Sequence, residues 1–278
     1  MRMTGPVKGA RSCITSPRNP EVLRVVRLGR DAALRRREGL AVAEGPRLVE
    51  EALARLGPQS VERLYVSEAF AEGDGAAWVR RCPVPWVIVS AEAFRRMADT
   101  RTPQGVLALV RRPVPAPAAL WGAPGAVLAL DAVQDPGNVG AALRAAAAFG
   151  AAGAVLGPGC ADPWGPKALR GAMGAAFSLP LVEAADLAAA LEEARRAGRL
   201  VVALDARGSE RVDRLPLDRA VLLLGSEGRG LGEAAAAADA VARIPFAEGM
   251  ESLNVAAAAA VALYEAARRA RGEDVARA

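Results

Sequence analysis

Residues 127–144 read VLALDAVQDPGNVGAALR, and this stretch joins an apolar run to a turn and then to a helix. The run VLAL is typical of a strand that is buried on both faces of a sheet. Pro136 and Gly137 mark a turn, and Asn138 is predicted to cap the helix that follows. Arg144 lies four residues after Gly140, so both are expected on one face of that helix. The order strand, turn, helix predicts an α/β fold.

The same pattern repeats through the C-terminal half of the chain. Strands are predicted at 127–130, 154–156, 200–204, 221–224 and 241–244, and helices at 139–149, 167–173, 186–197, 232–238 and 252–270. Nearly continuous apolar strands that alternate with helices indicate a parallel sheet with helices on both faces. Ligands of such sheets bind beyond the carboxyl ends of the strands. The loops that directly follow strands are therefore the candidate functional loops.

The N-terminal half predicts a smaller α/β domain. Its expected strands are 40–43, 61–66, 86–89 and 106–110, and its expected helices are 20–37, 46–56 and 91–97. Residues 111–125, RRPVPAPAALWGAPG, contain four prolines. Prolines at this density oppose a helix or a central strand and favour a stiff linker. The predicted organisation is a first domain over 1–112, a linker over 113–125 and a second domain over 126–278.

The residue composition excludes several kinds of chemistry. The chain has no histidine, which rules out Ser-His-Asp and Cys-His catalysis and the HExxH zinc site. Its cysteines, Cys13, Cys82 and Cys160, are isolated, so we expect no metal site and no disulfide framework. We find no apolar run of about 18 residues and no signal peptide, so we expect no membrane partner and a cytoplasmic protein.

Two further loops follow predicted strands. Residues 222–232, LLLGSEGRGLG, place four glycines within eight residues, and their exposed N–H groups can bind a polar ligand. Residues 242–254, ARIPFAEGMESLN, end a strand and lead into an Ala-rich helix that Ser252 or Asn254 can cap. Neither a GxGxxG fingerprint nor a GxxxxGK[ST] phosphate loop is present. Taken singly, each of the three loops can also be a turn with a helix cap.

In this order and spacing, the three loops resemble those of the SpoU (TrmH-like) family of RNA 2′-O-methyltransferases. The likeness extends over residues 127–269 and includes DPWGPKALRGAMGAAFSLP at 162–180. In the N-terminal domain, ITSPRNPEVLRVVRLG (14–29) and AEGPRLVEEAL (43–53) resemble the substrate-binding extension of the ribosomal-RNA members. That extension has a ribosomal-protein-like fold.

The resemblance implies a trefoil-knotted, SPOUT-type catalytic domain and a homodimer whose active site uses both subunits. It implies S-adenosylmethionine as the cofactor, with Gly225, Gly230, Ile244 and Leu253 at its binding site. The implied catalytic arginine is Arg144. The other matching motif positions are Asn138, Glu227, Ser252 and Asn254.

The resemblance also directs expectations about roles. Since guanidinium groups are poor bases, we expect Arg144 to hold a phosphate and stabilise the developing alkoxide. Glu227 is expected to shape its loop or orient an arginine, and Asn254 to hold substrate or close the knot. Methylation of a base at C5 is disfavoured, because Cys160, the best-placed thiol, has no histidine to activate it.

The basic residues are concentrated near the start of the chain. Residues 1–37 hold ten lysines and arginines and two acidic residues, within a net charge of +5. The candidate RNA phosphate contacts are Arg18, Arg24, Arg27, Arg35, Arg36 and Arg37. The same cluster can also be a solvated helix face.

The expected function is therefore 2′-O-ribose methylation of structured RNA, with 23S ribosomal RNA favoured by the N-terminal extension. The modification can be a housekeeping one or one that confers antibiotic resistance. The alternatives are a transfer-RNA 2′-O-methyltransferase and a non-catalytic RNA-binding or ribosome assembly factor of the same fold.

Overall fold

The computed structural model describes residues 13–73, 75–226, 230–247 and 250–272. The chain divides into two compact units. Unit 1 comprises Met1–Arg112 together with Trp164–Pro166, and unit 2 comprises Pro113–Pro163 and Lys167–Ala278. No helix in the described part of the chain is long and apolar enough to cross a membrane.

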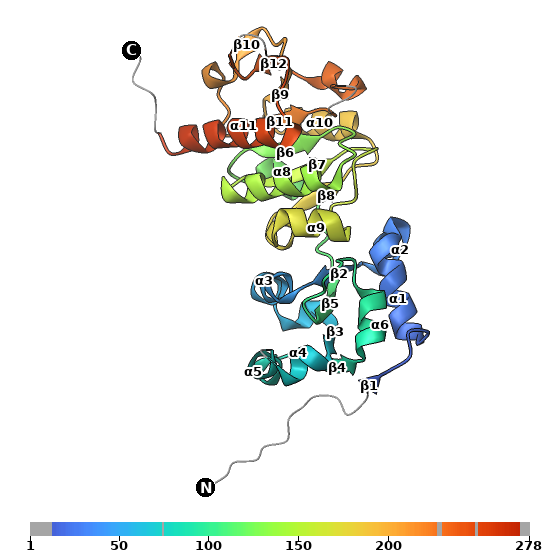
Figure 1. Cartoon of the computed structure of the whole chain (residues 1–278). Helices are drawn as coiled ribbons and strands as arrows, with labels where there is room; N and C mark the ends of the chain where they lie inside the picture. The colour runs from blue at the N-terminus through green and yellow to red at the C-terminus, as the bar shows by residue number, and fades with distance from the viewer. Residues whose placement is uncertain (1–12, 74, 227–229, 248–249, 273–278) are drawn as a thin grey trace. The chain divides into compact units, whose positions relative to one another are not determined.

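Unit 1 is a five-stranded sheet with helices (Figure 1). Its elements are β1 (Cys13–Ile14), α1 (Pro20–Arg30), α2 (Ala32–Glu38), β2 (Leu40–Glu44), α3 (Pro46–Leu56), β3 (Val61–Ser67), α4 (Glu68–Glu72), α5 (Ala76–Arg81), β4 (Trp86–Val89), α6 (Ala91–Met97) and β5 (Val106–Arg111). The strand order is β1-β4-β3-β5-β2. Strands β1, β4 and β3 pair in parallel, whereas β5 is antiparallel to both β3 and β2. Apolar side chains of α1 and α6 pack with the sheet in one core.

Unit 2 contains the larger sheet. Its elements are α7 (Pro117–Gly122), β6 (Val127–Leu130), α8 (Pro136–Ala148), β7 (Gly153–Leu156), α9 (Pro166–Ala172), β8 (Leu181–Glu183), α10 (Leu187–Arg196), β9 (Val201–Leu204), β10 (Glu210–Arg211), β11 (Val221–Leu224), β12 (Ala240–Arg243) and α11 (Val255–Ala270). Seven strands pair in the order β10-β12-β9-β11-β6-β7-β8, and every pairing is parallel.

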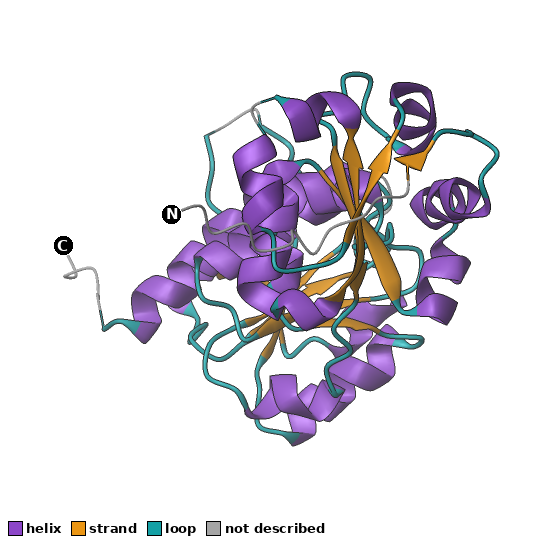
Figure 2. Ribbon diagram, turned by 90° about the horizontal axis from the view of Figure 1, so that it is seen from below, coloured by secondary structure: helices purple, strands orange, loops and turns teal. Residues whose placement is uncertain are grey.

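Helices cover the central strands of this sheet. Strands β6, β7 and β11 are buried along their whole length. Helix α8 packs along α11 and also contacts β6 and β7. Helices α7 and α10 share a hydrophobic core with buried side chains of β6, β7, β9 and β11. Figure 2 shows the strands between the helices. The prediction of an α/β fold with a parallel sheet is confirmed.

Three predicted elements differ from the structure. The helix expected over 20–37 is two helices, because Asp31 ends α1 and its carboxylate accepts a hydrogen bond from Leu34 N at 3.0 Å to cap α2. The helix expected over 232–238 is a 3₁₀ helix, Glu233–Ala237. The prediction that residues 113–125 contain no helix is also wrong, because α7 forms there. Pro117 lies in the first turn of α7, where its missing N–H leaves no helical hydrogen bond unmade.

Helix α7 is held by Arg199, which is only 2% exposed. Its guanidinium donates hydrogen bonds to carbonyl oxygens around the end of α7 and to one before β11: Leu120, Trp121, Ala123, Gly125 and Arg219. Burial is the main cause that lowers the pKa of Arg199. One buried cation therefore fastens residues 120–125, the end of the proline-rich stretch, to the rest of unit 2.

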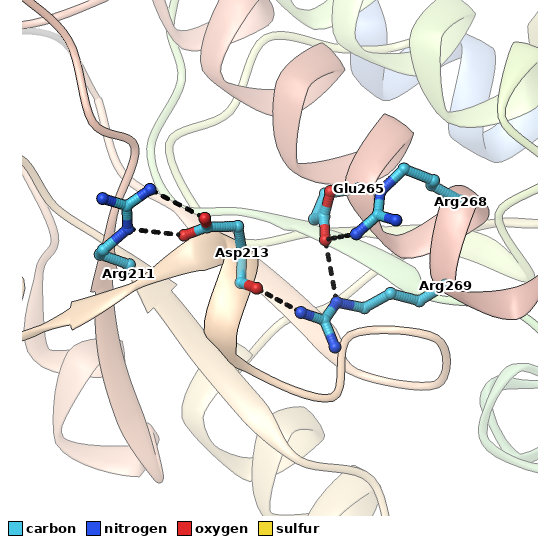
Figure 3. A network of polar contacts seen from close by, with 5 residues as sticks. All are labelled: Arg211, Asp213, Glu265, Arg268 and Arg269. Carbon is cyan, nitrogen blue, oxygen red and sulfur yellow. Dashed lines mark hydrogen bonds and ion pairs between the residues drawn. The ribbon is translucent and has the colours of Figure 1, made fainter. Parts of the chain in front are cut away.

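A polar network fastens the end of α11 (Figure 3). The Glu265 carboxylate accepts hydrogen bonds from Arg268 Nη2 at 2.8 Å and from Arg269 Nε at 2.9 Å. Arg269 also donates to the carbonyl oxygen of Asp213, whose carboxylate accepts two bonds from Arg211. The contact with Arg268 is the main cause that holds the pKa of Glu265 below its ordinary value. The network ties α11 to the 3₁₀ turn Val212–Arg214 that follows β10.

Candidate functional site

A cavity of about 410 Å³ lies at the carboxyl ends of β9, β11 and β12, beside the start of α11. This is the edge of a parallel sheet at which ligands are expected. Five residues that the sequence singled out line it: Gly225, Gly230, Ile244, Ser252 and Leu253. Its volume lies within the range of small-molecule sites.

The loop after β11 forms one wall of the cavity and depends on two glycines. A Cβ atom on Gly225 would lie 2.1 Å from Gly230 O, so only glycine fits there without moving the backbone. Gly230 has φ +65°, and its N–H donates to Ser226 O at 2.8 Å. Ser226 and Gly230 thus lie side by side at the cavity wall. Glu227, predicted within this loop, lies outside the described residues.

The loop after β12 leads to α11 and forms another part of the wall. Asn254 caps α11, because its Oδ1 accepts hydrogen bonds from Ala256 N and Ala257 N at 3.0 and 3.3 Å. Its Nδ2 donates to Asn138 Oδ1 at 3.1 Å. Asn254 therefore joins this loop to the one after β6.

Helix α8, which follows the loop after β6, has a different N-cap residue from the predicted one. Helix α8 begins at Pro136, and Asp135 is its N-cap, accepting a hydrogen bond from Asn138 N at 2.9 Å. The prediction that Asn138 caps this helix is wrong, because Pro136 suits the first helical position and Asn138 falls inside the first turn. Lys167 Nζ lies 2.8 Å from Asp135 Oδ2 and is the main cause that lowers the pKa of Asp135.

Hydrogen bonds link all three loops. Asp131 Oδ2 accepts from Gly232 N at 2.8 Å, which joins the loop after β6 to the loop after β11. Asn138 and Asn254 join the loop after β6 to the loop after β12. The three segments singled out in the sequence are thus connected, and the loops after β11 and β12 line the cavity.

Arg144 lies on α8 with an exposed side chain, and it is not among the residues that line the cavity. It has no ion pair with any carboxylate in the described part of the chain. Gly140, one turn earlier on α8, packs against α9. A Cβ atom on Gly140 would lie 2.4 Å from Ala168 O. The guanidinium is therefore available to a ligand outside the cavity wall.

Sequence reasoning missed three charged residues of the cavity wall: Asp205, Arg207 and Glu251. Asp205 directly follows β9, so the rule that ligands bind after parallel strands would have found it. Its Oδ1 accepts a hydrogen bond from Arg207 N at 2.8 Å, which shapes the turn after β9. Glu251 had no comparable signal, since it lies in the middle of an irregular loop.

The arginines proposed for RNA occupy different environments. Arg18, Arg27, Arg36 and Arg37 are exposed. Arg24 is paired with Glu38 at 2.8 Å and Glu62 at 2.7 Å. Arg35 is 4% exposed and donates to Leu28 O at 2.5 Å, so the structure contradicts its proposed role as a surface phosphate contact.

Comparison with known proteins decides the family. Residues 125–264 match the model of the SpoU rRNA Methylase family, and residues 19–108 match the MRM3-like substrate binding domain. The chain belongs to the SpoU rRNA methylase family. The resemblance found in the sequence is confirmed, as is an N-terminal substrate-binding domain.

Three relatives show how far the likeness extends. An uncharacterized tRNA/rRNA methyltransferase of Mycobacterium tuberculosis is 35% identical over 83% of this chain and 82% of its own length. The 23S rRNA (guanosine(2553)-2′-O)-methyltransferase RlmP of Bacillus subtilis is 33% identical over 80% of this chain and 86% of its own. The SpoU methyltransferase AviRb of Streptomyces viridochromogenes, solved in complex with AdoMet, has 27% identity and a TM-score of 0.82 over 91% of this chain and 98% of that one.

S-adenosylmethionine is the cofactor of this SpoU methyltransferase, as the sequence predicted. The cavity suits such a molecule in size and in chemistry. Backbone around Gly225 and Gly230 offers polar groups, Leu253 and Ile244 offer apolar contact, and Asp205 supplies a carboxylate. Among the described residues, no cluster of cysteine, aspartate and glutamate could hold a metal ion.

Proposed function

We propose that this SpoU methyltransferase transfers a methyl group to a ribose 2′-hydroxyl of 23S ribosomal RNA. The observation that carries the proposal is a cavity at the carboxyl edge of the sheet that two motif loops line, with the third motif loop hydrogen-bonded to both. The name of the Bacillus subtilis relative supports both the 2′-O position and the 23S substrate. The substrate-binding domain supports a large structured RNA over a free nucleoside.

The residues of the cavity would hold the cofactor in the following way. Gly225 and Gly230 let the backbone approach it closely, and Ile244 and Leu253 bury its apolar parts. Bound S-adenosylmethionine supplies an electrophilic methyl group on a sulfonium. Ser252 adds a hydroxyl at the wall, while Asn138 and Asn254 hold two of the loops together.

Arg144 is proposed to act on the RNA. Its exposed guanidinium on α8 can hold the phosphate beside the target ribose and stabilise negative charge that develops on the 2′-oxygen. Positioning of the hydroxyl then contributes much of the rate enhancement. Glu227, outside the described residues, retains its proposed role in shaping the loop or orienting an arginine.

We also propose that the enzyme works as a homodimer with a knotted C-terminal domain. Val261 and Tyr264 stand one turn apart on α11 with 41% and 48% of their surfaces exposed. Large apolar side chains exposed on a helix are typical of a surface that another protein covers. A second copy on this face of α11 would also meet α8, which carries Arg144.

Methylation of unmodified 23S ribosomal RNA transcribed in vitro tests the proposal. Enzyme and S-adenosylmethionine are incubated with this RNA and, in a parallel reaction, with unmodified transfer RNA. Each RNA is digested to nucleosides and analysed by mass spectrometry. We expect one 2′-O-methylnucleoside. A base-methylated nucleoside would contradict the proposed position, and methylation of transfer RNA alone would contradict the substrate. Failure to bind S-adenosylmethionine in calorimetry would favour the non-catalytic assembly factor.

A further inference from the structure

We infer that unit 1 contacts RNA phosphates through an edge loop, defined as residues 98–105, together with Arg47. This inference rests on the proposed function, because it assigns a surface for the same RNA. It adds another part of the domain to the contact expected within residues 18–37.

The edge loop lies at the carboxyl edge of three strands. Strands β3 and β4 are parallel, and β3 and β2 both run antiparallel to β5. Hence β2, β3 and β4 end at the same edge. The loop reaches that edge at Gly105, whose carbonyl oxygen accepts a hydrogen bond from Ser67 N at 2.8 Å at the end of β3. Open α/β sheets bind ligands beyond this edge.

A buried carboxylate holds the start of the loop. Glu44, at the end of β2, is 8% exposed and accepts hydrogen bonds from Asp99 N at 2.8 Å and Thr100 N at 3.3 Å. Thr100 Oγ1 donates to it as well. Buried carboxylates are costly unless they are hydrogen-bonded, and these bonds fix the backbone on which Arg101 stands.

The far end of the loop meets the start of α3. Gly45 N donates to Val106 O at 2.9 Å, and a Cβ on Gly45 would lie 2.9 Å from Gln104 Oε1. Gln104 therefore lies against the residue that precedes α3, two positions before Arg47. The exposed side chains of Arg47, Arg101, Thr102 and Gln104 belong to this one edge of the domain.

The two guanidinium groups are exposed, as Arg18, Arg27 and Arg37 are, and differ in this from Arg24 and Arg35. Neither Arg47 nor Arg101 forms an ion pair with a carboxylate among the described residues. Arg24, in contrast, is paired with two glutamates, and Arg35 is buried. Unpaired exposed guanidiniums on a fixed backbone suit phosphate groups, and Thr102 and Gln104 add polar contacts. The ligand that fits is the backbone of folded RNA.

A matched pair of double variants tests the inference. Arg47→Ala/Arg101→Ala removes two charges from the carboxyl edge. Arg80→Ala/Arg81→Ala removes two exposed charges from the end of α5, which leads to the amino end of β4. Binding to in vitro transcribed 23S ribosomal RNA is measured by filter retention across a series of salt concentrations, with a thermal melt of each variant.

We expect the Arg47/Arg101 variant to bind RNA about tenfold or more weakly, with a salt slope lower by roughly 1.5 to 2. The Arg80/Arg81 control should keep wild-type affinity, and both variants should bind S-adenosylmethionine normally. Equal RNA affinity of the two variants would overturn the inference. Methyl transfer by the wild type, measured on the same RNA, reports separately on the proposed function.

Discussion

The substitution Gly225→Ala should abolish most of the activity while leaving the fold intact. The added Cβ would lie 2.1 Å from Gly230 O, 2.3 Å from Gly230 C and 2.6 Å from Leu231 N. All three are backbone atoms, so no side chain can rotate to make room. Carbon and oxygen normally stay above about 3 Å, so the cavity wall must move by about 1 Å. A misplacement of this size can cost about 100-fold in rate.

Calorimetric titration with S-adenosylmethionine and methyl transfer to RNA measure the effect. We expect affinity and kcat/KM to fall together by about 100-fold, equivalent to about 2.8 kcal/mol. Gly122→Ala is the control, since nothing lies within 4 Å of its Cβ position and its φ is not positive. Wild-type affinity in Gly225→Ala would refute the assignment of this loop to the cofactor site.

Three further predictions concern α8 and α11. Arg144→Ala should lower methyl transfer by about 100- to 1,000-fold and leave S-adenosylmethionine affinity unchanged; weaker cofactor binding would contradict its assignment to the RNA. Since Arg268 lowers the pKa of Glu265, that carboxylate stabilises the fold above about pH 4.3, and the stabilisation is lost as the pH falls through the lowered pKa. Glu265→Gln should therefore reduce the free energy of unfolding in urea by about 3 kcal/mol at pH 7; an undiminished difference at pH 3 would oppose this reasoning. Val261→Arg/Tyr264→Arg should sediment as a monomer where the wild type is a dimer, and an unchanged sedimentation coefficient would exclude this face as the interface.

Apolar patterning predicted the central strands of unit 2 because they are buried on both faces. It missed β8 and β10, which have three and two residues and sit at the two edges of the sheet. Such strands are too short for a periodic signal and form through pairing with a neighbour. Helix α7 was missed because Pro117 was treated as a helix breaker although it occupies the first turn.

The site could be predicted only in part. The glycine-rich turn after a strand marked the loop at 222–232, and the family resemblance selected Gly225 and Gly230 within it. The bond between Asn138 and Asn254 joins residues 116 positions apart, and no local pattern encodes such a contact. Charge density pointed to residues 18–37, but it could not show that Arg24 is ion-paired and Arg35 buried. Tertiary contacts decide which arginines are available to RNA.

Mapping of 2′-O-methyl groups on 23S ribosomal RNA tests whether this enzyme methylates that RNA in the cell. RNA from a strain that lacks this protein is compared with RNA from its parent, and from the deletion strain complemented with Arg144→Ala. We expect one ribose methylation that is present in the parent and missing from the other two strains. Identical maps in all three would contradict this expectation.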